Sequence, residues 1–263
     1  MIRYAVLGSG SNGNSYIINY KESSILIDAG FSLRQLKLRV GASGIDFSTI
    51  QALFITHLHP DHARGAGVFA RQTHLPVYIH HSINDTIKEF ASLGIPPHLT
   101  QFFQVGTPLK VGDFTITSFF TSHDSPYSVG FVIEIQQKRF LLLTDTGFVE
   151  PDMLTAATDC DVLFLEANYD EIMLQDGPYP YYLKKRISGP YGHLSNSDSI
   201  AFLNTLTPTY SQKVYFCHLS NTNNRTDLLQ KFIQKELTWK GEHTICINGE
   251  TYFSYLNIKE ESL

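Results

Sequence analysis

Four side chains that can bind a metal ion fall within six consecutive residues. Residues 57–62 read His-Leu-His-Pro-Asp-His, so His57, His59, Asp61 and His62 bring together three imidazoles and one carboxylate. Imidazole and carboxylate groups are ligands of zinc, manganese and iron. Four ligands are too many for one ion that keeps an open position. The spacing therefore predicts two ions, one bound by His57 and His59 and the other by Asp61 and His62.

An apolar run comes directly before this motif and must position it. Residues 52–55 read Ala-Leu-Phe-Ile, which predicts a short buried strand. Pro60 and the polar residues around it are expected to end the strand and force a loop. The ligands would then stand on a rigid strand tip, which suits a site that must hold its geometry. The alternative interpretation is an ordinary polar surface loop.

Three further candidate ligands have the same placement. His123, Asp145 and His218 each follow an apolar, strand-like run. Any one of them alone could be a polar residue that merely ends a strand. Four strands that end in this way favour a shared metal site. A carboxylate can bridge two ions about 3.5–4 Å apart, and Asp145 is the candidate for that position.

Predicted strands and helices make up the rest of the chain. Strands are predicted at residues 4–7, 16–18, 25–27, 77–79, 101–105, 113–119, 128–135 and 139–144. Helices are predicted at residues 32–40, 63–73, 82–93, 181–187, 197–206 and 225–237. Two strand-rich halves, each followed by helices, predict a four-layer αββα sandwich with two central sheets. No linker or low-complexity run marks a boundary, so residues 1–263 are expected to form a single domain.

Composition, the lengths of apolar stretches and the cysteine count indicate the cellular compartment of the protein. Hydrophobic residues make up 43% of the 263 residues, which is ordinary for a soluble protein with a sizeable core. No apolar stretch is long enough to cross a membrane, and the N-terminal residues lack the pattern of a signal peptide. The three cysteines, Cys160, Cys217 and Cys246, are too few and too scattered for a disulfide framework. We therefore expect a cytoplasmic protein.

A glycine-rich segment imitates a dinucleotide-binding motif. Residues 8–13 read Gly-Ser-Gly-Ser-Asn-Gly and follow a predicted strand. The dinucleotide motif requires a helix next, whereas residues 14–18, Asn-Ser-Tyr-Ile-Ile, are strand-like. We therefore expect no nucleotide cofactor. The exposed backbone N–H groups of such a loop can still face an anion, which makes Ser9 and Asn12 candidate phosphate contacts.

The motif H-x-H-x-D-H, followed by an isolated His, Asp and His, resembles the metallo-β-lactamase superfamily. The closer resemblance is to the YycJ/WalJ family of metallohydrolases and covers essentially the whole chain. It rests on residues 8–15 (GSGSNGNS), 26–30 (LIDAG), 144–147 (TDTG), 192–196 (GHLSN) and 218–220 (HLS). The resemblance implies the αββα fold and phosphodiester hydrolysis. Members of the family are described as DNA exonucleases, and ribonuclease Z is a more distant relative.

The same resemblance implies the ligand sets. One ion would take His57, His59 and His123, the other would take Asp61, His62 and His218, and Asp145 would bridge them. Asp61 would also orient a hydroxide between the ions. The chain departs from the family at residues 166–170, which read Glu-Ala-Asn-Tyr-Asp where E-S-N-H-D is common.

His193 stands just before the predicted helix at 197–206. It is similar to the H-S-T element of ribonuclease Z, whose histidine assists the leaving group or the phosphate, so His193 is a candidate general acid. The alternative is that it only packs at the start of the helix. Ser195 and Asn196, which follow it, are candidate phosphate contacts.

The resulting prediction is a two-metal hydrolase of phosphodiesters, acting on DNA in preference to RNA, with zinc or manganese as cofactor and iron as a further possibility. One alternative is a hydrolase of a small ester, thioester or cyclic phosphodiester, which the net charge of −5 favours mildly. Another is a non-catalytic, metal-stabilised binding module. A nucleic-acid substrate needs a local basic patch on so acidic a chain. The candidates for it are Lys184, Lys185, Arg186 and Arg225.

Overall fold

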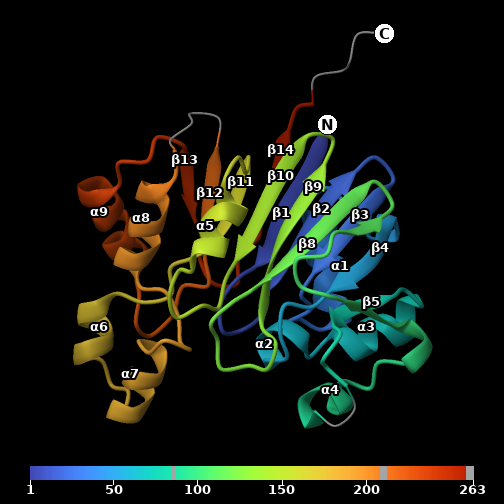
Figure 1. The fold of residues 1–263 in the computed structure, drawn as a ribbon, viewed down its shortest axis with the longest axis horizontal. Helices are drawn as coiled ribbons and strands as arrows, with labels where there is room; N and C mark the ends of the chain where they lie inside the picture. The colour runs from blue at the N-terminus through green and yellow to red at the C-terminus, as the bar shows by residue number, and fades with distance from the viewer. Residues whose placement is uncertain (85–86, 208–211, 259–263) are drawn as a thin grey trace.

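The computed structural model describes residues 1–84, 87–207 and 212–258. Over these residues two sheets of seven strands lie face to face, and helices cover the outer side of each (Figure 1). The predicted αββα sandwich is thereby confirmed. The two sheets are built alike, because each has an antiparallel half followed by a parallel half.

The strands lie in chain order in both sheets, except that β14 is at the edge of the first sheet beside β1. The first sheet contains, in spatial order, β14 (Tyr252–Leu256), β1 (Ile2–Gly8), β2 (Ser15–Tyr20), β3 (Ser23–Ile27), β4 (Ile50–Phe54), β5 (Val77–His80) and β6 (Thr100–Phe103). The second contains β13 (Glu242–Ile245), β12 (Lys213–Cys217), β11 (Val162–Glu166), β10 (Lys138–Leu143), β9 (Val129–Ile135), β8 (Phe114–Phe120) and β7 (Leu109–Val111). Residues 14–18 continue into β2, as the strand-like pattern after the glycine-rich loop predicts.

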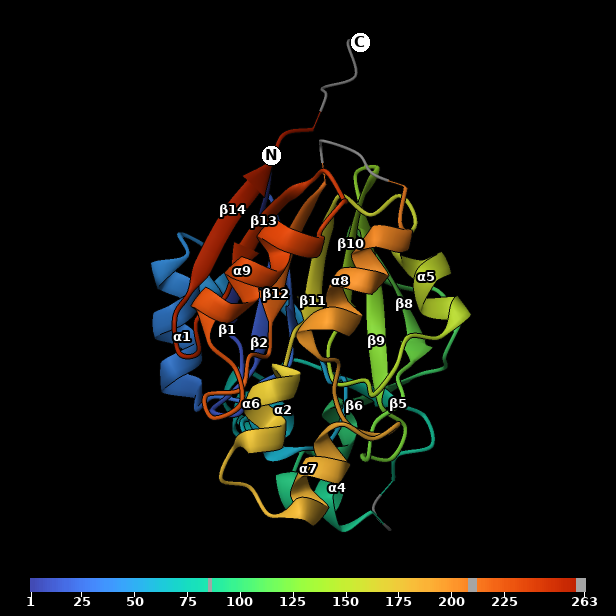
Figure 2. The same cartoon turned by 90° about the vertical axis from the view of Figure 1, so that its left-hand side faces the viewer.

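The helices fall into three groups. Those packed on the first sheet are α1 (Leu33–Ala42), α3 (Ala66–Thr73) and α4 (Lys88–Leu93), with the 3₁₀ turns η1 (Phe47–Thr49) and η2 (Pro97–Leu99) beside them. Those packed on the second sheet are α5 (Pro151–Ala157), α8 (Asn196–Thr205) and α9 (Thr226–Glu236). The short helices α2 (Pro60–Ala63), α6 (Glu171–Asp176) and α7 (Tyr181–Ile187) lie at one end of the sandwich (Figures 1 and 2).

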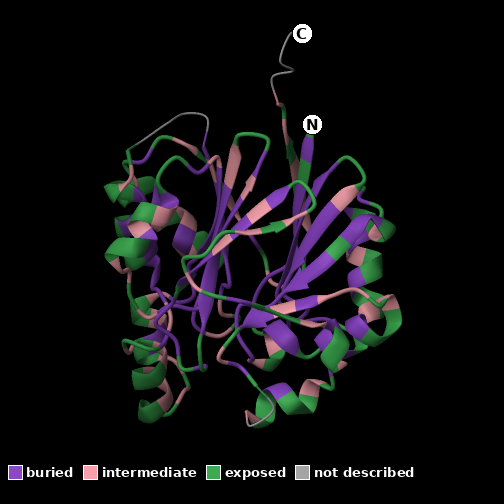
Figure 3. Ribbon diagram, turned by 45° about the vertical axis from the view of Figure 1, so that its right-hand side comes forward, coloured by how far each residue is buried: buried purple, intermediate pink, exposed green. Residues whose placement is uncertain are grey.

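Apolar residues form three layers that match this architecture. One cluster lies between the two sheets, and one lies between each sheet and its helices. The inner strands of each sheet are buried almost throughout, whereas the four edge strands, β14, β6, β13 and β7, and the outer sides of the helices are largely exposed or half-buried (Figure 3). Between the sheets, the ring of Phe131 packs edge-on against Phe54 and Phe103, with centroids 5.8 and 5.5 Å away. Phe131 therefore links β9 to two strands of the opposite sheet.

Replacement of Phe131 by alanine is expected to lower the free energy of unfolding by about 3–5 kcal/mol, because it leaves a cavity in a fully buried position. Urea denaturation measures this loss. The control is Phe253→Ala on β14, where the side chain is 63% exposed and a change within about 0.5 kcal/mol is expected. Equal losses in the two variants would contradict the assignment of Phe131 to the inter-sheet core.

Three predictions of local structure differ from what the structure shows. The helix predicted at 63–73 is divided into α2 and α3, because the N–H of Gly65 bonds to the carbonyl of Ala29 and interrupts the helix. Pro60 does not force a loop but starts α2 as its first residue, where a missing N–H costs nothing. The predicted helix at 82–93 starts only at Lys88, and residues 85–86 lie outside the described residues.

Candidate metal centre

The candidate ligands meet at one edge of the sandwich because the strands that carry them end there. His57 follows β4, His123 follows β8, Asp145 follows β10 and His218 follows β12. The last three strands run in the same direction in the second sheet, so their carboxyl ends lie together. This end of the sandwich also carries α2, α6 and α7 (Figure 1).

Three residues at this end of the sandwich hold a left-handed backbone conformation, which is uncommon for residues other than glycine. Asp28, Asp145 and His218 have φ of 60°, 60° and 57°, and each directly follows a strand or its exit residue. Left-handed conformations of such residues cost free energy and persist where the surroundings fix them, commonly at functional sites. Oδ1 of Asp145 and Nε2 of His218 lie 3.5 Å apart across the site, and Asp28 contacts His62 from the buried side.

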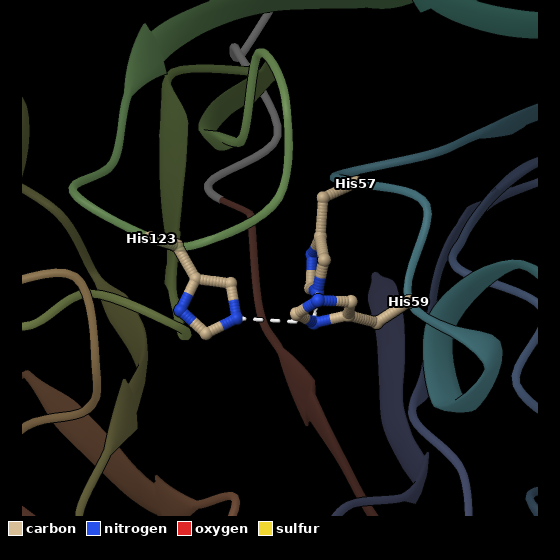
Figure 4. A group of neighbouring side chains, drawn as sticks. All are labelled: His57, His59 and His123. Carbon is tan, nitrogen blue, oxygen red and sulfur yellow. Dashed lines mark hydrogen bonds between the residues drawn. The ribbon is translucent and has the colours of Figure 1, made fainter. Parts of the chain in front are cut away.

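His57, His59 and His123 form the first donor group (Figure 4). Nδ1 of His59 lies 3.1 Å from Nε2 of His57 and 3.1 Å from Nε2 of His123. The other ring nitrogen of His123 lies 2.9 Å from the carbonyl of Gly192, so Nδ1 carries the proton and Nε2 presents its lone pair. Burial lowers the pKa of all three histidines, which keeps them neutral and able to bind a cation.

Asp61, His62 and His218 form the second donor group. Nδ1 of His62 lies 2.7 Å from the buried carboxylate of Asp28, which turns Nε2 of His62 toward the site. Nε2 of His218 lies 3.4 Å from Oδ2 of Asp61, and Nε2 of His62 lies 3.6 Å from the same oxygen. Sequence reasoning did not assign Asp28, although it follows an apolar strand just as the predicted ligands do.

Asp145 lies between the two groups. Its Oδ2 is 3.3 Å from Nε2 of His62, and its Oδ1 is 3.5 Å from Nε2 of His218 and 3.7 Å from Nε2 of His123. Oδ2 is buried and accepts no hydrogen bond from any residue that the structure describes. A buried carboxylate oxygen without a hydrogen bond is costly, and a cation between the histidines would satisfy it. This donor set therefore fits divalent metal ions.

The charges of the second group depend on one another. Burial alone would lower the pKa of His62, but the carboxylates of Asp145, Asp28 and Asp61 outweigh it and raise the pKa to about 9. Burial would likewise raise the pKa of Asp61, but His62 and His218 lower it to about 2. The carboxylates thus favour the protonated form of His62, and a divalent ion bound at its ring would release that proton.

Metal affinity should therefore rise with pH. The pKa of His62 in the folded chain is raised above 6.5, so its proton stabilises the metal-free fold at acidic pH, and this contribution disappears as pH rises through about 9. Below pH 9, each displaced proton should weaken metal binding by up to about tenfold per pH unit. Competition titrations with a zinc chelator between pH 6 and 9 measure the slope. A flat profile would show that neutral His62 is already the resting form.

Glu166 is a member of the site that the sequence reasoning missed. It ends β11 and is fully buried, and its Oε1 lies 2.6 Å from Nδ1 of His193 and 3.3 Å from Nδ1 of His218. The other oxygen accepts hydrogen bonds from the backbone N–H groups of Thr146 and Leu194. Burial would raise the pKa of Glu166, but His193 and its hydrogen bond lower it, so the group is a carboxylate.

A cleft of about 360 Å³ opens onto the donor groups. His59, Asp61, Asp145, His193 and His218 line its floor. The structure thus places His193 in the cleft, while the cap of α8 is provided by Ser195. The other wall comes from the 168–187 segment and from the glycine-rich loop, whose contribution is Ser11.

The candidate phosphate contacts lie elsewhere. Ser195, Asn196, Ser9 and Asn12 are not among the described residues that line the cleft. Ser195 forms a capping box with Asp198, and Asn196 exchanges amide hydrogen bonds with Asn224. The hydroxyl of Ser9 accepts a hydrogen bond from the backbone N–H of His218 at 2.7 Å. Ser9 therefore holds the backbone of His218 in position. Asn12 is exposed, and its carbonyl accepts from Arg64.

The candidate basic residues lie in three different places. Arg186 lines the cleft and forms an ion pair with Asp124, next to the first donor group. Lys184 and Lys185 line a second concavity on the opposite side of α7. Arg225 is paired with Asp227 through two hydrogen bonds and does not line the cleft formed by the described residues. Arg186 is therefore the cation of this set that is nearest to the donor groups.

The fold of the chain is similar to that of proteins of known structure. The crystal structure of YhfI, a metallo-β-lactamase fold protein from Bacillus subtilis, aligns with a TM-score of 0.71, at 21% identity, over 96% of this chain and 99% of YhfI. The fold is therefore the metallo-β-lactamase fold. Residues 23–219 match the family described as the beta-lactamase superfamily domain.

Curated relatives narrow the class further. The exodeoxyribonuclease YycJ of Bacillus anthracis is 30% identical over 91% of this chain and 90% of its own length. The exodeoxyribonuclease WalJ of Streptococcus pneumoniae is 32% identical over 89% of this chain and 88% of its own length. The chain belongs to the metallo-β-lactamase superfamily and, within it, to the family of YycJ and WalJ, and it is a metal-dependent hydrolase. Within the described residues, no helix combines the length and apolar character needed to cross a membrane.

Proposed function

We propose that the chain is a two-metal phosphodiesterase that removes nucleotides from an end of DNA. The observation that carries the proposal is the place of Asp145, with one oxygen toward His62 and the other toward His123 and His218. In this arrangement His57, His59 and His123 would hold one ion, Asp61, His62 and His218 would hold the other, and Asp145 would be shared. Both curated relatives named above are called exodeoxyribonucleases, which supports the choice of substrate.

Two bound divalent ions would supply Lewis acidity for the phosphate oxygens and a water of lowered pKa. Zinc and manganese both accept this set of imidazoles and carboxylates, and we propose one of these two, with iron as a third possibility. Asp61 keeps its charge at neutral pH, because the pKa of its carboxyl is about 2, and it lines the cleft, where it orients the attacking water.

His193 provides the proton for the leaving group. Its Nδ1 donates to Glu166, so Nε2 is the atom that faces a bound substrate. The buried carboxylate of Glu166 accepts this hydrogen bond and fixes the orientation of the ring. A proton held at Nε2 can then pass to the departing oxygen of the scissile phosphodiester. Ser11, Ser220 and Asn168 also line the cleft and are the polar groups that we assign to the phosphate, in place of Ser195, Asn196, Ser9 and Asn12.

We place this activity in the cytoplasm. All three cysteines, which lie within the described residues, are free and buried, as is common for proteins of a reducing compartment.

A cleavage assay tests the proposal. Metal-loaded protein is incubated with end-labelled single-stranded DNA, duplex DNA, RNA of the same sequence and a small chromogenic phosphodiester. Mononucleotide release from DNA is the expected result. Cleavage of the small diester with all nucleic acids left intact would replace the nuclease by a small-molecule hydrolase. Faster cleavage of RNA than of DNA would make the protein a ribonuclease.

A further inference from the structure

Helix α7 is unusual because it covers the cleft without packing into the core. Among its residues 181–187, all of them described, none is buried. Leu183, Arg186 and Ile187 face the cleft, while Tyr181 and Tyr182 are 72% and 74% exposed. Figure 2 shows α7 at the lower end of the molecule, next to α6 and away from the sheets. Large exposed aromatic side chains beside a cleft indicate a surface that contacts a ligand.

The side chains of α7 alternate in type around the helix. With 3.6 residues per turn, the order from the rim of the cleft outward is Arg186, Tyr182, Lys185 and Tyr181. Arg186 lines the cleft, and Tyr181 and Lys185 line the concavity on the far side. The ammonium of Lys185 lies 5.1 Å from the ring centroid of Tyr181. The four side chains form one continuous strip, cation–ring–cation–ring, which we call the α7 strip.

We propose that the α7 strip binds a single-stranded segment of the DNA substrate next to the phosphodiester held in the cleft. Bases stack on Tyr182 and Tyr181, and backbone phosphates contact Lys185 and Arg186. The inference rests on the proposed function. It adds that the bound part of the substrate is single-stranded and that the strand extends from the cleft across α7.

The chemistry of the strip favours single strands over duplex. An aromatic ring can stack only on a base whose face is free, and the bases of a duplex are already stacked on one another. Duplex recognition relies mainly on cations that contact phosphates. The chain has a net charge of −5, and Arg186 is partly neutralised by Asp124, so electrostatic attraction is weak. Stacking is a source of affinity that does not require positive charge.

Binding of a labelled single-stranded oligothymidylate to the metal-loaded protein tests the strip. The oligonucleotide carries phosphorothioate linkages, so that it is cut slowly, and fluorescence anisotropy gives the dissociation constant. Tyr182→Ala and Tyr181→Ala should each raise it about 5- to 140-fold, the range for the loss of one base–ring stack. Tyr182→Phe keeps the ring and should restore binding. Tyr255→Ala on β14, where an exposed tyrosine lies on the edge strand, is the matched control and should change nothing.

Salt dependence separates the two components of the strip. The tyrosine variants should weaken binding equally at all salt concentrations, whereas Lys185→Ala should reduce the slope of log affinity against log salt by about 0.7. Unchanged binding in both tyrosine variants would overturn the proposal. Equal losses for single-stranded and blunt duplex DNA would also overturn it, because a stacking strip distinguishes them. Cleavage of ordinary DNA by the wild-type protein is scored separately, so the strip can fail while the nuclease stands.

Discussion

Replacement of Asp145 by asparagine is expected to remove both metal ions and to abolish hydrolysis. The amide has nearly the shape of the carboxylate but no charge, and both carboxylate oxygens of Asp145 face histidines of the two donor groups. Elemental analysis after reconstitution with zinc or manganese should give two ions per chain for the wild type and well below one for Asp145→Asn. His57→Ala, which affects the first group alone, should retain about one ion.

The matched control is Asp161→Asn. Asp161 precedes β11 and pairs with Lys138, at the opposite end of that strand from Glu166. This variant should keep both ions and full activity. If Asp145→Asn also retained two ions, Asp145 would not be shared, and each donor group would have to bind its ion independently.

The second large effect concerns His193. Replacement by alanine should leave both metal ions bound and lower turnover by about 10²–10⁴-fold, the usual contribution of a general acid. The reason is geometric, because Nδ1 of His193 is committed to Glu166 at 2.6 Å and only Nε2 is free for the substrate. Steady-state rates on DNA, together with metal content, measure the effect. His243→Ala, at an exposed position of β13, is the control.

The outcomes distinguish three roles for His193. Loss of metal in a folded His193→Ala variant would make it a ligand. Unchanged turnover would reduce it to a packing residue ahead of α8. A further variant, Glu166→Gln, should lower activity about 10- to 100-fold, because a partner that orients a site histidine is removed without changing the shape of the side chain.

The candidate ligands were predictable because strand ends leave a clear signal in sequence. An apolar run with a candidate ligand within three residues of its end describes His57, His123, Asp145 and His218, and the structure brings all four to one end of the sandwich. Glu166 has the same signal, since it follows Val-Leu-Phe-Leu, but it belongs to the strand itself and was not separated from it. That residues 1–263 form one domain remains a prediction.

Other features depend on contacts that no local pattern reveals. Phe120 is apolar and lies in a strand, yet it is 51% exposed, because it ends β8 on the side opposite to its buried neighbour Phe119. The polar residues after His193 read as phosphate contacts, although Ser195 and Asp198 have the spacing of a capping box, which the structure confirms. The sequence does not indicate that α7 lies over the cleft. A helix without a buried side has no apolar stripe that would show which way it packs.

The central claim is that two ions share Asp145. Anomalous diffraction from crystals of the protein loaded with zinc or manganese tests it most directly. The account predicts two peaks per chain, one among His57, His59 and His123 and one among Asp61, His62 and His218, with Asp145 contacting both. A single peak at full occupancy, or a second peak that Asp145 does not contact, would contradict it.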